Sequence, residues 1–165
     1  MKKSVSVSTL AVFIALFAPL PAAATTLPTA PYLPLDMAQK AANAALGKCT
    51  ADGQRVSVAV VDRSGATKVL LKADGSGPHT VSSSTGKAFT SASMGRSTAD
   101  LSDFLKDHRE LDGLRDMDQR LVILAGGLPI KIGDALVGGI GVGGAPSGKI
   151  DEACAQAGLD AITNQ

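Results

Sequence analysis

Two histidines are the residues of this sequence whose type best suits metal or acid–base chemistry. His79 follows the Gly77-Pro78 loop and opens a predicted helix, whereas His108 shares a face with apolar residues of the next predicted helix. Loops frequently carry function, and a helix N-terminus favours the neutral imidazole that binds metals. An isolated histidine nevertheless more often has a structural role, so each residue needs a second observation before it becomes a ligand.

Hydrolytic and zinc chemistry have less support. Ser82, Ser83 and Ser84 follow His79 closely, but the G-x-S-x-G turn of many serine hydrolases does not occur in the sequence. Solvated hydroxyls and helix capping explain these serines more simply. The sequence also contains no carboxylate cluster and no His/Cys spacing typical of zinc sites.

Two glycine motifs match nucleotide-binding patterns only as strings. Residues 139–144 read G-x-G-x-x-G, but they lie largely inside a predicted strand instead of between a strand and a helix. Residues 143–149 read G-x-x-x-x-G-K between a strand and a helix, but Ile150 replaces the Ser or Thr that binds Mg²⁺. A glycine-rich strand that allows close backbone approach is the better interpretation of both.

The N-terminus has the pattern of an export signal. Lys2 and Lys3 precede an apolar run over residues 10–20 and then Pro21-Ala22-Ala23-Ala24, which predicts cleavage after Ala24. The run is shorter than the roughly 20 apolar residues of a membrane span, so no span is expected after cleavage. Residues 25–34, with three prolines, are expected to form an extended lead-in to a single domain over residues 35–165. The expected location is the periplasm or the extracellular space.

Export makes the two cysteines informative. Cys49 and Cys154 are the only cysteines, and outside the cytoplasm an even number favours a disulfide. A two-cysteine metal site would need further thiols or imidazoles at short spacing, and none is nearby. The predicted bridge joins the end of the first helix to the start of the last.

The composition is typical of a packed domain, and the chain lacks the large positive charge that nucleic-acid binding requires. The 165 residues are 45% hydrophobic and 19% charged, with a formal net charge of +1. Aromatic residues are only 3% of the chain, so the stacking platforms that bind bases are almost absent. We therefore expect no nucleic-acid partner.

The apolar spacing predicts an α+β fold in the order α-β-β-α-α-β-β-β-α, with helices packed on a five-stranded antiparallel sheet. The predicted helices cover residues 35–46, 79–94, 97–108 and 149–162, and the predicted strands cover residues 55–61, 67–72, 121–124, 128–132 and 135–142. Ser97 or Thr98 is expected to cap the N-terminus of the helix predicted over residues 97–108.

Several segments, taken together, resemble the GlcG/HbpS haem-binding family, which is related to PduO C-terminal domains. They are VAVVDRSG at residues 58–65, DGSGP at 74–78, KAFTSA at 87–92, AGGLPI at 125–130, GGIGV at 138–142 and DEACA at 151–155. The resemblance extends from about Leu35 to Ile162 and implies an α+β sheet domain that forms homo-oligomers, from dimers up to octamers. It also implies haem binding and, in some members, haem degradation. The resemblance therefore allows both an enzyme and a protein that only binds haem.

Haem would suit this chain if two subunits present helix faces of small residues and an axial imidazole or thioether. We expect His79 to be the first candidate for the haem iron, His108 the second and Met94 the third, with Lys87 and Arg96 near enough in sequence to pair with propionates. The leading prediction is an exported protein that stores, transfers or degrades haem. A cofactor-free oligomeric sensor or scaffold of the same fold is the first alternative, and a small-molecule enzyme that uses the glycine-rich loops as an anion site is the second.

Overall fold

The computed structural model describes residues 26–163, and the predicted signal peptide over residues 1–24 lies outside this range. Four strands form one antiparallel sheet in the order β2-β1-β4-β3. The strands are β1 (Ser57–Asp62), β2 (Thr67–Lys72), β3 (Gly127–Ile132) and β4 (Ala135–Gly143). Within the described range, no helix is long and apolar enough to span a bilayer.

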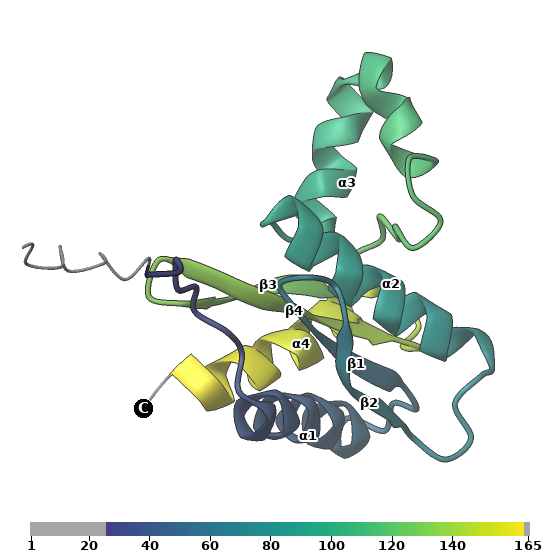
Figure 1. The fold of residues 1–165 in the computed structure, drawn as a ribbon. Coiled ribbons are helices and arrows are strands. Elements are labelled where there is room, and N and C mark those ends of the chain that lie inside the picture. Colours follow the sequence, from purple (N-terminus) through teal and green to yellow (C-terminus); the bar gives the residue numbers. More distant parts are fainter. Residues whose placement is uncertain (1–25, 164–165) are drawn as a thin grey trace, which may run out of the picture.

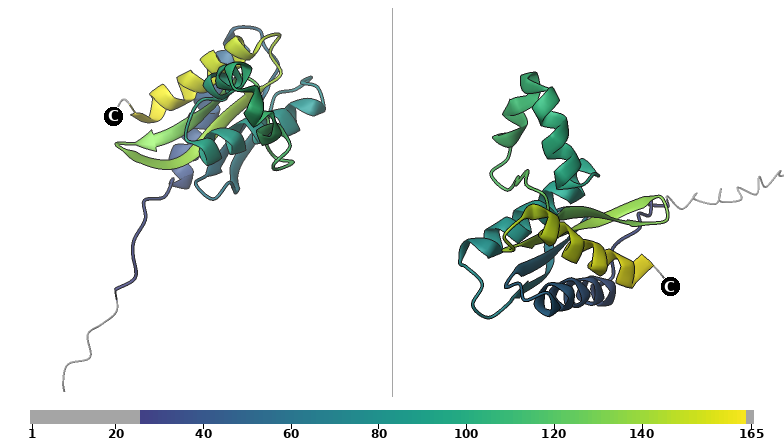
Figure 2. Two further views of the ribbon diagram at one scale, coloured as in Figure 1. Left: turned by 90° about the horizontal axis from the view of Figure 1, so that it is seen from above. Right: turned by 180° about the vertical axis from the view of Figure 1, so that it is seen from behind.

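Helices cover both faces of the sheet (Figure 1). One face packs against α1 (Leu35–Ala51) and α4 (Gly148–Thr163), and the other face packs against α2 (His79–Met94). A second view from behind shows α1 and α4 together below the sheet, with α3 (Thr98–Asp107) and the 3-10 helix η1 (Arg109–Arg115) standing away from the body (Figure 2). We call residues 98–115 the arm. Ser97 caps the first helix of the arm, and its side chain accepts a hydrogen bond from the Asp100 amide at 3.0 Å. Ser97 was one of the two caps that the sequence predicted.

Alternation along β4 explains why its two faces accept such different partners. Ile140 and Val142 point into the main core with α1 and α4. Gly139 and Gly141 face α2, where a Cβ on either would collide with a backbone carbonyl oxygen of that helix. The G-x-G-x-x-G string is therefore a packing surface, which confirms the interpretation that these glycines allow close backbone approach.

The expected disulfide is present between Cys49 on α1 and Cys154 on α4, with Cα atoms 5.5 Å apart. Both cysteines are fully buried in the main core. The bridge closes a sequence separation of 105 residues and holds the two helices on one face of the sheet.

The predicted fifth strand over residues 121–124 is wrong, because this segment has no strand structure and the sheet has four strands. The Val122 amide donates instead to the Thr90 hydroxyl of α2 at 2.8 Å. The segment crosses α2 at Gly86, where a side chain would collide with Val122. Its apolar run serves packing across a helix, which a short apolar pattern does not distinguish from a buried strand.

Candidate functional site

A groove of about 660 Å³ runs along the exposed side of α2, away from the sheet. The helix supplies one wall, the β1–β2 turn supplies one end, and the segment after the arm supplies the other wall. The groove is lined by Gly65, Thr67, His79, Val81, Ser82, Ser83, Thr85, Gly86, Phe89, Gln119, Arg120, Val122 and Leu124. Aliphatic and aromatic side chains with a few polar groups are typical of small-molecule and cofactor sites.

Phe89 and Arg120 form one end of this groove. The Arg120 guanidinium lies 4.0 Å from the centroid of the Phe89 ring, within the range of a cation–π interaction. The β1–β2 turn approaches the same ring so closely that a Cβ on Gly65 would lie 2.6 Å from it, and Gly65 has a positive φ of 83°. Packing by α2 and the turn therefore fixes the aromatic ring.

Asp118 orients Arg120 by a two-point contact. The Nη2 and Nε atoms of Arg120 donate to the two carboxylate oxygens of Asp118 at 2.7 and 3.0 Å. These side-chain bonds, followed by the bond from the Arg120 amide, lower the pKa of Asp118 to about 2. The same side-chain contact raises the pKa of Arg120, so this end of the groove holds a fixed guanidinium–carboxylate pair.

His79 lies toward the other end of the groove as the first residue of α2. Its side chain is exposed, and it lines the groove together with a second, smaller cavity. Ten residues of helix separate His79 from Phe89, which corresponds to about 15 Å along the axis. An accessible imidazole and a guanidinium thus stand at separate positions along one partly apolar wall.

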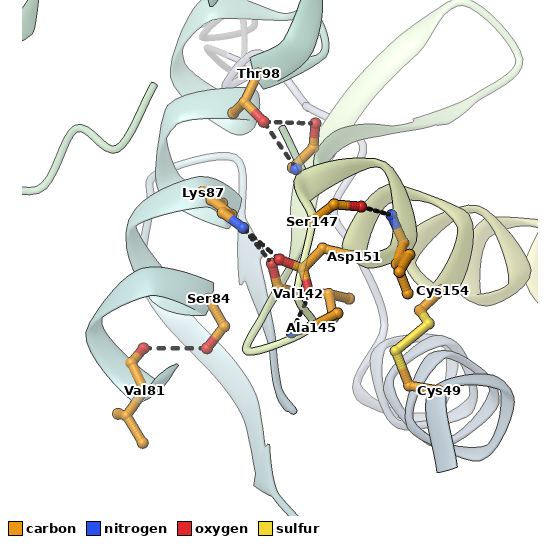
Figure 3. A network of polar contacts seen from close by, with 12 residues as sticks. Cys49, Val81, Ser84, Lys87, Thr98, Val142, Ala145, Ser147, Asp151 and Cys154 are labelled. Carbon is orange, nitrogen blue, oxygen red and sulfur yellow. Dashed lines mark hydrogen bonds and ion pairs between the residues drawn. A yellow bond between two sulfur atoms is a disulfide. The ribbon is translucent and has the colours of Figure 1, made fainter. Parts of the chain in front are cut away.

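Lys87 is buried and has a different environment from the one its sequence position suggested. Its Nζ atom donates to Asp151 Oδ2 at 2.8 Å and to the Val142 carbonyl oxygen at 2.9 Å. Figure 3 shows the lysine reaching from α2 to the first turn of α4, where Asp151 Oδ1 accepts the Ala145 amide at 3.0 Å. Both side chains of the ion pair are only 4% exposed. The pair joins three elements: α2, the end of β4 and the start of α4.

The remaining three candidates lie at the arm. Met94 packs against the small apolar cluster of the arm, and the Arg96 guanidinium lies 5.1 Å from the Phe104 ring centroid. The His108 ring stacks on Phe104 with centroids 4.2 Å apart and contacts Glu110 Oε1 at 3.1 Å. His79 and Met94 stand at opposite ends of α2, about 22 Å apart along the axis. The structure therefore places His79 and Lys87 in one region and Met94, Arg96 and His108 in another.

Comparison with protein-family models matches residues 33–160 to the family described as "Haem degrading protein HbpS-like". This match covers most of the chain. The chain belongs to the HbpS-like family. The resemblance drawn from the sequence motifs is thereby confirmed.

Solved structures related to this HbpS-like chain share its fold. A double glutamate-to-aspartate variant of HbpS from Streptomyces reticuli is 44% identical, with 86% of this chain and 96% of that chain covered and a TM-score of 0.77. A PduOC protein solved in complex with haem is 26% identical, with 80% and 96% covered and a TM-score of 0.75. An uncharacterized 15.0 kDa protein encoded between dhaT and dhaS in Citrobacter freundii is 31% identical over 111 residues, 67% of this chain and 78% of that protein.

Sequence reasoning missed Arg120 and Asp151 in this HbpS-like chain. Arg120 stood in a charge-rich segment without periodicity, and Asp151 lies 64 residues from its partner Lys87, so neither had a local signal. A usable signal did exist on α2, where His79, Ser83 and Lys87 recur every four residues and line the smaller cavity together.

Proposed function

We propose that this chain is an exported haem-binding protein that stores, transfers or degrades haem in the groove along α2. The observation that carries the proposal is the groove, whose volume of about 660 Å³ lies within the usual range for cofactor sites. Family membership and the haem complex of the related PduOC protein support the same cofactor.

The residues of the groove fit an iron porphyrin. When bound, haem supplies an iron that takes axial ligands and carries redox chemistry. The His79 imidazole is the proposed ligand, because it is exposed at the start of α2 and lines the groove. Val81 and Phe89 would contact the macrocycle and exclude water, and Arg120 would pair with a propionate.

His108 and Met94 remain the second and third proposed ligands, and Arg96 a second propionate partner. They lie at the arm, so within one copy they do not line the groove. They would complete the site only from a neighbouring copy. Their role is therefore tied to the proposal that the protein forms homo-oligomers, from dimers up to octamers.

Export to the periplasm or beyond is part of the proposal. The disulfide supports it, because such bonds persist in oxidising compartments. The predicted signal peptide and its cleavage site after Ala24 belong to the same proposal.

A hemin titration with matched histidine variants tests the proposal. The wild-type protein should develop a Soret band that His79→Ala weakens or shifts, while His108→Ala, a change at the arm, should have the smaller effect. An unchanged spectrum in both variants would contradict the proposal that a histidine imidazole binds the haem iron. Added reductant then separates the roles, since loss of the band with release of iron indicates degradation and a stable band indicates storage or transfer. If no band forms, the cofactor-free oligomeric scaffold is favoured instead.

A further inference from the structure

A second cavity, of about 380 Å³, adjoins the groove and shares His79, Ser83 and Leu124 with it. Its walls are the stripe of α2 that carries Ser83 and Lys87 and the loop that joins β4 to α4. That loop contributes Ala145, Pro146 and Ser147, which do not line the groove. The proposal of a haem groove assigns no role to this cavity.

The floor of the cavity holds a buried ammonium group with an unused donor. Lys87 has three N–H donors, of which Asp151 and the Val142 carbonyl each accept one. Among the described residues no hydrogen-bond acceptor takes the third. The Lys87 side chain is only 4% exposed and lines the cavity, so a ligand with a hydrogen-bond acceptor is favoured there.

The charges around the ammonium group limit which ligand fits. Asp151 balances the charge of Lys87, and its second oxygen is taken by the Ala145 amide. The start of α4 adds a partial positive charge beside the pair. One further negative charge is therefore favourable, whereas a phosphate dianion would meet the Asp151 carboxylate at close range.

We propose that this cavity binds a small carboxylate, whose oxygens accept from Lys87 Nζ and from the Ser83 hydroxyl. Two sources share this chemistry: a free short-chain organic acid, or a propionate of haem reaching past His79 from the groove. The second source rests on the proposed haem function, and the first does not.

The test begins with hemin-free protein and free propionate as the probe. Amide NMR should show saturable shifts centred on Ala145 and Ser83, and the dianion of inorganic phosphate should bind more weakly than propionate, because the Asp151 carboxylate repels its second charge. Ala125→Leu reduces the volume of the cavity and keeps both Lys87 and Asp151, whereas Lys87→Met removes the donor. Each variant should weaken propionate binding, by about tenfold or more for Lys87→Met, the loss expected for one charge-assisted hydrogen bond. Circular dichroism checks that both variants fold. Absent shifts, equal binding of phosphate, or unchanged binding to folded Ala125→Leu would each overturn the proposal.

Hemin and its dimethyl ester then distinguish the two sources. If hemin displaces propionate and the ester does not, the cavity takes a porphyrin carboxylate. If propionate and hemin bind together without competition, the ligand is a free organic acid. Both outcomes support the carboxylate site. Failure of hemin to bind at all would end the proposed haem function and leave the propionate result standing.

Discussion

Among the ion pairs of the described residues, we expect the buried pair of Lys87 and Asp151 to lose the most stability when one of its side chains is removed. Removing one member of a buried pair leaves the other charge unpaired, which typically costs about 3–5 kcal/mol. We therefore expect Lys87→Met to lower the free energy of unfolding by about that amount, measured by urea denaturation. Lys106→Met is the matched control, because its pair with Asp103 is exposed and should contribute little. Equal losses in the two variants would contradict the buried-pair account.

Asp118 gives a prediction about pH. Its hydrogen bonds to Arg120 lower its pKa from 3.8 to about 2. A carboxyl group with a lowered folded pKa contributes stability above its unfolded pKa, and the contribution disappears as pH falls through the folded value. An NMR titration should therefore find Asp118 charged at pH 3, and Arg120→Gln should return its midpoint toward 3.8. A midpoint near 3.8 in the wild type would contradict the contact.

At the level of residues, the sequence could predict which groups have useful chemistry but not which of them meet. His79 lies at the start of α2, the position that its Gly-Pro loop predicted, and the structure shows that it is exposed. Lys87 could be named as a cation, but its partner Asp151 comes from the other end of the chain and only tertiary packing brings them together. Arg120 has no periodic context, so its place beside Phe89 depends on the path of the segment after the arm.

The contact between α2 and β4 is the central packing interaction between elements. Gly141→Ala would push a methyl group into the Ser84 carbonyl oxygen, and α2 would have to move away from the sheet. We expect a loss of about 1–3 kcal/mol or more, the usual range for overpacking, in urea denaturation. Gly47→Ala on α1 is the control, because its Cβ would meet open space and should stabilise the helix by roughly 0.5–1 kcal/mol. Similar effects at both glycines would refute the close-approach argument.

The disulfide acts at the same scale, because it links α1 to α4. A cross-link that closes a loop of about 100 residues contributes roughly 4.7 kcal/mol in the chain-entropy model. The Cys49→Ser, Cys154→Ser double variant should unfold at clearly lower urea than the oxidised wild type. Reductant should lower the midpoint of the wild type and leave that of the variant unchanged. A wild-type midpoint that ignores reductant would show that the bridge is not a stabilising link.

The sequence predicted the helices and strands whose apolar periodicity is long or clear. It did not predict the structure of a segment whose conformation depends on tertiary packing. Helix α2 begins and ends at the expected residues, and the β1–β2 hairpin follows its turn signal. Residues 121–124 had the composition of a buried strand, but their backbone bonds to Thr90 of α2 instead of to a neighbouring strand. Only the tertiary position of the segment separates these two outcomes.

At the scale of the whole molecule, the fold leaves α2 with one side on the sheet and the opposite side open as the groove. The arm stands away from the body (Figure 1). Leu111 in the arm is 37% exposed, and Met117, two residues after the arm, is 62% exposed. We propose that copies of the chain meet through such surfaces. That assembly would bring the candidates at the arm, His108 and Met94, to the groove of a neighbour.

The measurement that tests the central claim most directly is the absorbance spectrum of the purified protein before and after addition of hemin, recorded in parallel with His79→Ala. The account predicts a saturable Soret band in the wild type and a weaker or shifted band in the variant. A wild-type spectrum equal to that of free hemin at every ratio would contradict it.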